Sequence, residues 1–325
     1  MLNISVMSYY EAILNEYSFV SLSDKSSYRS TGKTWRLNDT AGSGNYWVYE
    51  QSDYFNIKIH DFFFYEDTLL KTMIPECLSI TYYESISGEE LYPYRRLNAG
   101  CIKAIIGSNQ EYRALIHKNI PIRSIGIEIM PSYYEDYLKK QFPEEYTNPK
   151  YAFFSLDQTM VFPEMVFLLN QVRDYHGDGM AAKLFYESKM TEAISLVVEY
   201  QRKNYSSNTR KISSEDVKNI ELATAYLNDH STSDVPLDCL AKIACMSLSK
   251  FKYSFKQVNK CSVTEYIQNR RMSQAECLLS NTDLSISNIA RSVGYSNPSR
   301  FSELFKKSTG LLPGMYRKMA NRTNR

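Results

Sequence analysis

The C-terminal third of the chain contains an internal repeat. Residues 237–247 align with residues 286–296, and every matched position is 49 residues apart. A Phe-x-x-x-Phe pair follows each copy, with an offset of 50 residues. One residue is therefore added in the second copy after the aligned segment. A repeat of this kind marks one supersecondary unit per copy, so this region must fold as two similar units.

Each copy has the pattern of a helix-turn-helix. Apolar residues three or four positions apart predict a first helix, and a small residue, Ala241 or Ala290, stands where two helices would cross closely. Gly294 can supply a left-handed turn position at little cost. The first copy has Cys245 at that position, where a side chain is less well tolerated.

The second helix of each copy begins at a capping residue. Ser247 is expected to cap the first of these helices and Asn297 the second. Pro298 then occupies the first helical position, where a missing N–H costs nothing. The Phe pairs, spaced i and i+4, lie on one helix face and are expected to dock each second helix on the first.

The stretch between the copies, 263–279, predicts a helix with one broad apolar face. Seventeen residues make a rod of about 25 Å at 1.5 Å per residue. Such a rod can hold two recognition helices roughly one DNA turn, ~34 Å, apart. Both helices could then enter successive major-groove segments on one face of a duplex.

Charge is distributed unevenly along the chain. Residues 211–325 carry 17 Lys and Arg against 10 Asp and Glu, whereas the whole chain has a formal net charge of +2. A basic C-terminal part on an acidic body suggests a nucleic-acid partner. A solvated Lys and Arg surface explains the charge equally well.

Aromatic residues divide the chain at the same place. Of the 27 Tyr, 15 Phe and 2 Trp, only 9 lie beyond residue 210, and the stretch 201–211 is polar. That stretch is typical of a linker. We therefore expect an N-terminal domain over 1–205, a linker over 206–214 and a C-terminal domain over 215–320.

The sequence carries no signal for a metal site or a membrane span. The 6 cysteines show no C-x-x-C spacing, and the 4 histidines are scattered. We therefore expect free thiols, no metal and no cofactor. No apolar run approaches the length of a span, and the N-terminus lacks the features of a signal peptide. These features predict a cytoplasmic protein without a membrane partner.

Residues 45–130 alternate between apolar and polar positions. Ile125, Ile127 and Ile129 alternate with polar or small residues, and the same period recurs over 55–60 and 78–82. This period predicts strands with one buried face. Several short strands separated by turn residues predict an antiparallel sandwich or barrel.

After Pro131 the period becomes helical, with helices predicted over 132–142, 161–172 and 180–203. The last of these is long, and its apolar positions include Leu184, Ile194, Val197 and Val198. Its apolar face either forms a homodimer interface or packs on its own barrel, and the pattern favours neither.

The aromatic residues of the N-terminal part invite a ligand-pocket interpretation. Small-molecule sites are lined by apolar and aromatic side chains, and a small barrel offers an interior. Aromatic residues also favour strands and fill cores without any ligand. The candidate effector-pocket residues are Trp35, Trp47, Tyr49 and Tyr82.

Residues 214–320 resemble the DNA-binding domain of the AraC/XylS family of transcription regulators. Apolar pairs, glycines and aromatic residues in that family's order carry the resemblance: Leu240-Ala241, Phe251-x-x-x-Phe255, Arg271-Met272-x-x-Ala275-x-x-Leu278-Leu279, Ile289-Ala290, Gly294-Tyr295-Ser296, Phe301-x-x-x-Phe305-Lys306 and Gly310-x-x-Pro313-x-x-Tyr316-Arg317. The resemblance implies seven helices, with helix-turn-helix motifs over 237–258 and 286–309 joined by the linker helix 263–279. It also implies sequence-specific binding to double-stranded promoter DNA.

Residues 1–200, with strands followed by helices, are similar to the cupin-like effector and dimerisation domain of many family members. The expected fold is therefore an α+β protein of two domains. An N-terminal antiparallel β-barrel of cupin-like type is followed by helices, and the C-terminal domain is all-α. The resemblance implies a barrel that holds a ligand and helices, within 180–203, that pair two subunits.

The resemblance also assigns DNA contacts. Positions that read bases in the family correspond here to Ser249, Lys252 and Tyr253 in the first motif, and to Pro298, Ser299, Arg300 and Glu303 in the second. The candidate phosphate contacts, which position a protein without specifying sequence, are Lys250, Lys256, Arg270, Arg291, Lys306 and Lys307. Lys and Arg side chains donate to guanine O6 and N7, which makes Lys252 and Arg300 the strongest candidates for base reading.

The favoured function is a transcription regulator that responds to a small molecule and contacts RNA polymerase if it is an activator. In the alternative, the N-terminal domain is only a dimerisation or protein-interaction module with no ligand. An enzyme is disfavoured, because the sequence has no G-x-S-x-G, P-loop or H-E-x-x-H motif. The adjacent acids Glu89 and Glu90 are expected to be solvated in a turn.

Overall fold

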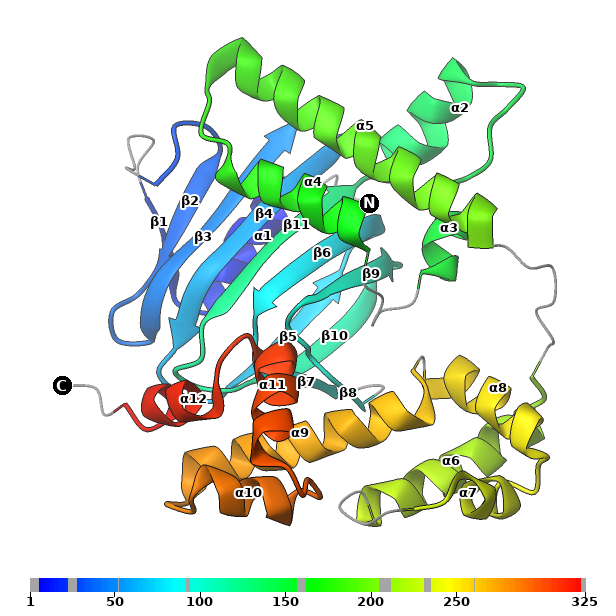
Figure 1. The fold of residues 1–325 in the computed structure, drawn as a ribbon. Coiled ribbons are helices and arrows are strands. Elements are labelled where there is room, and N and C mark those ends of the chain that lie inside the picture. The colour runs from blue at the N-terminus through cyan, green and yellow to red at the C-terminus, as the bar shows by residue number, and fades with distance from the viewer. Residues whose placement is uncertain are drawn as a thin grey trace. The chain divides into compact units, whose positions relative to one another are not determined.

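The computed structural model describes residues 6–22, 28–51, 53–91, 94–156, 162–204, 212–230, 235–259 and 261–322. The chain separates into two compact units, one within Met1–Tyr205 and the other Ser206–Arg322 (Figure 1). Most of the linker expected at 206–214 lies outside the described residues.

The described strands of the N-terminal unit form two antiparallel sheets. The strands are β1 (Phe19–Ser21), β2 (Lys33–Leu37), β3 (Gly42–Gln51), β4 (Phe55–Phe64), β5 (Thr68–Ile74), β6 (Cys77–Ser85), β7 (Gly88–Leu91), β8 (Tyr94–Arg96), β9 (Cys101–Gly107), β10 (Gln110–Ile116) and β11 (Ile122–Ile129). One sheet has the order β1-β2-β3-β4-β11-β6-β9, and the other has the order β5-β10-β7-β8.

The prediction of a closed barrel is therefore wrong for the described strands. Strand β5 leaves the seven-stranded sheet after β4 and pairs with β10, while β6 returns to pair with β11 and β9. No ladder among the described residues joins the two sheets. The alternating pattern predicted strands correctly but could not decide how their hydrogen-bonded edges join.

Helices flank these sheets. They are α1 (Val6–Glu16), the π-helix η1 (Ser132–Tyr137), α2 (Leu138–Gln141), α3 (Lys150–Ser155), α4 (Pro163–Asp174) and α5 (Gly179–Asn204). The helix predicted over 132–142 is thus a π-helical turn followed by a short α-helix. Helix α1 was not predicted from the sequence.

The seven-stranded sheet buries both of its faces. On one face, Ile57 and Ile127 join a core with α3, α4 and α5 that includes Val197, and Figure 1 shows α4 and α5 over this face. On the other face, Phe62 packs in a second core with Leu14 of α1 and with residues of the four-stranded sheet. The polar positions of these strands therefore also face the protein interior.

The C-terminal unit is helical. Its helices are α6 (Ser214–Asp229), α7 (Leu237–Ile243), α8 (Leu248–Asn259), α9 (Val263–Asn281), α10 (Ile286–Ser292), α11 (Pro298–Thr309) and α12 (Pro313–Ala320). Helices α6, α7 and α8 contact one another, and α8 contacts α9; α10, α11 and α12 all contact α9. With its 19 residues, α9 is about 28 Å long.

The two turns of the repeat share one geometry. Cys245 and Gly294 both have positive φ, 52° and 86°. In each copy the next N–H donates to the carbonyl five residues earlier, Met246 to Ala241 at 2.9 Å and Tyr295 to Ala290 at 2.8 Å. This is the Schellman arrangement that ends a helix with a left-handed residue. Cys245 therefore adopts the conformation that glycine provides more easily.

The expected caps of the second helices are confirmed. The Ser247 hydroxyl accepts the backbone N–H of Lys250 at 3.4 Å. The Asn297 side chain accepts the N–H groups of Ser299 and Arg300 at 2.9 and 3.1 Å. Both Phe pairs are fully buried, so each second helix is docked by its aromatic face as predicted.

The turn geometry gives the first prediction. Gly294→Ala should destabilise the C-terminal unit by about 1 kcal/mol, because a Cβ is strained at this φ. Cys245→Gly should raise its stability by roughly 0.5 kcal/mol, since relief of strain exceeds the added entropy of the unfolded chain. Urea unfolding of residues 206–325, followed by circular dichroism at the helical band, measures both. Equal stability of the Gly294→Ala and wild-type fragments would show that the turn is not conformationally demanding.

Candidate nucleic-acid interface and ligand cavity

The first recognition helix, α8, presents its candidate base readers on one side. Ser249 and Lys252 are exposed and Tyr253 is partly exposed, whereas Phe251 and Phe255 are fully buried. The buried pair faces the core of the first motif. The three candidates are therefore left on the accessible part of the helix.

The second recognition helix, α11, is arranged in the same way. Ser299, Arg300 and Glu303 are exposed, while Pro298, at the first helical position, is partly buried. The Arg300 Nη1 atom lies 3.2 Å from Glu303 Oε2, and both side chains are about two-thirds exposed, at 63% and 69%. An exposed pair of this spacing stabilises a helix by only about 0.3–0.5 kcal/mol. The ion pair is therefore weak, and another hydrogen-bond acceptor can replace Glu303 as the partner of Arg300.

The candidate phosphate contacts have different environments. Lys256, Arg291, Lys306 and Lys307 are exposed, and Arg270 on α9 is partly buried. The Lys250 ammonium lies 2.7 Å from Asp216 of α6, and this hydrogen bond lowers the pKa of the Asp216 carboxyl. Lys250 is thus already held by a carboxylate in the free protein.

Arg271 fixes the linker helix to the second turn. Its Nη1 atom donates to the carbonyl of Gly294 at 3.1 Å, and its guanidinium lies 5.5 Å from the ring centroid of Tyr295. The sequence motif includes Arg271 but predicts no role for it. Its spacing from the turn gave no signal that could have identified the contact.

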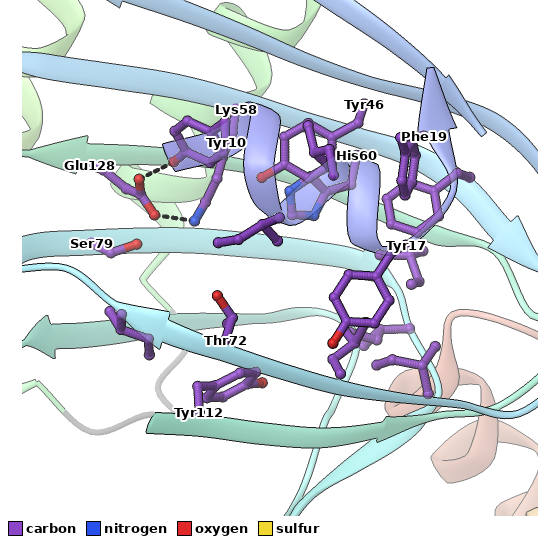
Figure 2. Close-up of a pocket in the computed structure, with 18 of the residues that line it drawn as sticks. Tyr10, Tyr17, Phe19, Tyr46, Lys58, His60, Thr72, Ser79, Tyr112 and Glu128 are labelled. Carbon is purple, nitrogen blue, oxygen red and sulfur yellow. Dashed lines mark hydrogen bonds and ion pairs between the residues drawn. The ribbon is translucent and has the colours of Figure 1, made fainter. Parts of the chain in front are cut away.

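The N-terminal unit contains a cavity of about 210 Å³. Its walls are α1, the inner face of the seven-stranded sheet and the four-stranded sheet (Figure 2). Aromatic side chains from all three elements line it, including Tyr10 of α1, Phe62 of β4 and Tyr112 of β10. The cavity therefore lies within the second core of this unit.

An ion pair lies at one side of the cavity. The Glu128 carboxylate accepts hydrogen bonds from the Tyr10 hydroxyl and the Lys58 ammonium, as Figure 2 shows. In the ladder, Lys58 stands opposite Gly126. A Cβ at Gly126 would lie 2.5 Å from the Thr81 hydroxyl oxygen and 3.3 Å from the Lys58 Cε atom. The glycine thus leaves room for the Lys58 stem on the inner face.

His60 lies beside this pair on β4. It stands between Tyr46 of β3 and Ser124 of β11 in the ladder, and its Nδ1 atom lies 2.9 Å from the Ser124 hydroxyl oxygen. Its Nε2 atom is buried without a hydrogen-bond partner. Burial, with the added repulsion of Lys58, lowers the pKa of His60 to about 3, so the ring is neutral at physiological pH.

The expected pocket residues lie elsewhere. Trp47 and Tyr49 pack on the helical side of the sheet, with ring centroids 6.0 and 4.5 Å from that of Tyr186. Trp35 is fully buried in the second core without lining the cavity. Tyr82 lines a separate cleft of about 270 Å³. The structure therefore does not bring these four side chains together.

Sequence reasoning missed the residues that do line the cavity. Lys58, His60, Ser79 and Glu128 occupy the polar positions of the alternating strands. Strict alternation predicts strands with one buried face and therefore a polar face in solvent. This face of the strands is buried only because α1 and the four-stranded sheet pack over it.

Glu89 and Glu90 are not solvated, contrary to expectation. They lie in β7 and are each only 8% exposed. Glu89 lies 3.0 Å from His117 Nε2, and Glu90 forms an ion pair with Lys103. Both residues pair with β10 and β8 in the four-stranded sheet, and each has a basic partner in the same unit.

The C-terminal geometry is that of a tandem helix-turn-helix domain. A family model described as a helix-turn-helix domain matches residues 240–319. The chain is 35% identical over 96 residues to the arabinose operon regulatory protein of Escherichia coli (strain K12), covering 29% of this chain and 33% of that protein. It is also 35% identical over 101 residues to the bifunctional transcriptional activator/DNA repair enzyme AdaA of Bacillus subtilis (strain 168), covering 31% of this chain and 48% of that protein.

Among solved structures, the chain is similar to the C-terminal domain of AraT, a response regulator from Geobacillus stearothermophilus. The identity is 31%, with 36% of this chain and 92% of that chain covered and a TM-score of 0.30. The C-terminal domain is thus a helix-turn-helix domain of the AraC type. The chain spans a third to a half of the length of the two curated relatives described above.

No helix in the described segments has both the length and the apolarity needed to cross a membrane.

The buried His60 ring gives the second prediction. The pKa of His60 is about 3 in the folded chain, below the ordinary value of about 6.5. The folded state therefore binds fewer protons in this range, and stability falls as the pH falls below about 6.5. Between about pH 7 and pH 5 this residue should account for a loss of up to about 2 kcal/mol.

Urea unfolding followed by tryptophan fluorescence measures this loss, because Trp35 and Trp47, the 2 tryptophans of the chain, both lie in the N-terminal unit. His60→Asn keeps a polar partner for Ser124 and should flatten the pH dependence. His176→Asn, at an exposed position, is the matched control and should behave as wild type. An unchanged slope in His60→Asn would contradict the assignment.

Proposed function

We propose that the protein is a sequence-specific DNA-binding transcription regulator. The observation that carries this proposal is the pair of helix-turn-helix motifs with the same turn geometry, both packed on α9. Two recognition helices held by one rod suit successive major-groove segments of a duplex. The basic charge of residues 211–325 supports contact with phosphates.

In this proposal α8 and α11 read bases. Lys252 and Arg300 donate to guanine, and the planar fork of Arg300 can bond both O6 and N7. Ser249, Tyr253 and Ser299 contribute less specific contacts. Lys306 and Lys307, in the last turn of α11, bind phosphate and set the position of the helix.

The N-terminal unit acts as the effector domain, of cupin-like type. Its cavity supports a ligand-binding role over a purely structural one, because its lining is mostly apolar and includes a few convergent polar groups. Occupancy of this cavity would control binding to promoter DNA. As an activator, the regulator would then contact RNA polymerase.

A homodimer formed through α5 completes the proposal. Ile194 and Val197 of this helix are buried against their own sheet, but Met180 and Leu184 are 77% and 59% exposed. The two exposed side chains are four residues apart and lie on the same side of the helix. They provide an apolar surface that a second copy of the chain can cover.

The third prediction separates base reading from phosphate binding. Arg300→Ala should cost about 1–3 kcal/mol on the cognate site and relax the preference at one base pair. Lys306→Ala should weaken cognate and random DNA about equally, because a phosphate contact carries no sequence information. Binding curves of the full chain on the cognate site and its single-base variants provide the measurement. If Arg300→Ala keeps the wild-type ranking of all variants, Arg300 does not read a base.

The fourth prediction concerns the dimer. Leu184→Glu should shift the chain from dimer to monomer in sedimentation equilibrium, because a charge in an apolar interface must be desolvated. Lys183→Glu, at the adjacent exposed position, is the control and should remain dimeric. A Leu184→Glu chain that stays dimeric would place the interface on another surface.

A further inference from the structure

We infer that the N-terminal cavity takes an uncharged ligand built on one aromatic ring with a single hydrogen-bonding substituent. This inference rests on the proposed effector role and names the chemical class of the effector. It follows from three properties of the cavity: its charge balance, its hydrogen-bonding groups and its size.

The charge balance excludes ions. Lys58 and Glu128 are the only lysine and carboxylate among the described residues that line the cavity, and they are paired with each other. Their side chains are only 16% and 10% exposed, so water screens them little. An anion or a cation would add a charge without a counter-charge to a mostly apolar site, which is unfavourable.

The remaining polar groups are neutral. His60 lines the cavity, and its Nε2 atom is buried without a hydrogen-bond partner. Burial lowers the pKa of His60 and raises that of Tyr46 well above 10, so neither side chain carries a charge at neutral pH. Ser79, 3% exposed, adds a hydroxyl on the neighbouring part of the wall. Such groups suit a hydroxyl or an amide, which exchange hydrogen bonds without bringing charge.

The volume of the cavity and the aromatic side chains in its wall favour a ligand with one aromatic ring. A cavity of about 150 Å³ holds a benzene molecule, and this one has about 210 Å³. The extra space accommodates a short substituent rather than a second large group. Tyr10, Tyr17 and Tyr112 present rings from α1 and β10 toward the same space (Figure 2). Aromatic rings pack on one another in offset or edge-to-face contacts, so a flat ring fits these walls.

The test compares four probes that share one ring: benzyl alcohol, benzoate, benzylammonium and toluene. Each is added at millimolar concentration and neutral pH to the full chain, and thermal unfolding of the N-terminal unit is followed by tryptophan fluorescence. Benzyl alcohol should raise the melting temperature by about 3 °C when present at roughly ten times its Kd. Toluene should give a smaller shift, and the two ions should give none.

Two variant pairs locate the effect. Thr72→Phe fills the cavity and should abolish the shift, whereas Met73→Phe, on the exposed side of the same strand, should keep it. Glu128→Gln leaves the Lys58 ammonium without its carboxylate and should give a shift with benzoate. Glu111→Gln, which removes an exposed carboxylate on β10, is the control and should give no shift with benzoate.

Two results would overturn the inference. One is a wild-type shift with benzoate or benzylammonium that equals or exceeds the shift with benzyl alcohol. The other is no shift with benzyl alcohol at any millimolar concentration. Both are read on the wild-type chain, so they do not depend on the folding of a variant. Promoter binding is measured on the same preparation, so that the two proposals can be separated. If the chain binds promoter DNA but none of the neutral ring compounds, the proposed function stands and only the proposed ligand class is wrong.

Discussion

Burial of both faces of the seven-stranded sheet is the constraint on which the N-terminal unit depends. A sheet covered on one side can leave its polar residues in water, but this one cannot. Lys58 and Glu128 must therefore neutralise each other, and Tyr10 reaches from α1 to complete the hydrogen bonds of the carboxylate. The cavity wall is consequently mostly apolar, and its lysine and carboxylate cancel each other's charge, which restricts the ligands it can accept.

The C-terminal unit depends on a different constraint, which is the left-handed residue at each turn. The conformation of Cys245 and Gly294 directs the chain into the second helix of each motif. Asn297 and Ser247 then cap those helices, and the buried Phe pairs dock them. Arg271 connects the shared helix α9 to the second turn. The aromatic pair of α8 and that of α11 each occupy the buried side of their helix. This packing therefore determines which positions of the two helices remain accessible.

Much of the C-terminal unit could be predicted from the sequence because its contacts are local. Helix boundaries depend on caps and turns that lie within a few residues, and the repeat displays each of them twice. The strands of the N-terminal unit were also predicted, since alternation is local as well. Helix α1 was missed, and the candidate pocket residues Trp47 and Tyr49 pack instead against α5. Aromatic content alone does not say which face of a strand a side chain occupies.

The sequence by itself determined two motifs with their turns, an alternating β-rich region and a basic C-terminal part, because each of these is written in neighbouring residues. Only the tertiary structure decided that the strands form two sheets and that a cavity lies between them. It also decided that Lys58, His60 and Glu128 share the cavity wall. These outcomes depend on which strand edges pair and on what covers each face. Such pairings join residues as far apart as Tyr10 and Glu128, and no local pattern encodes them.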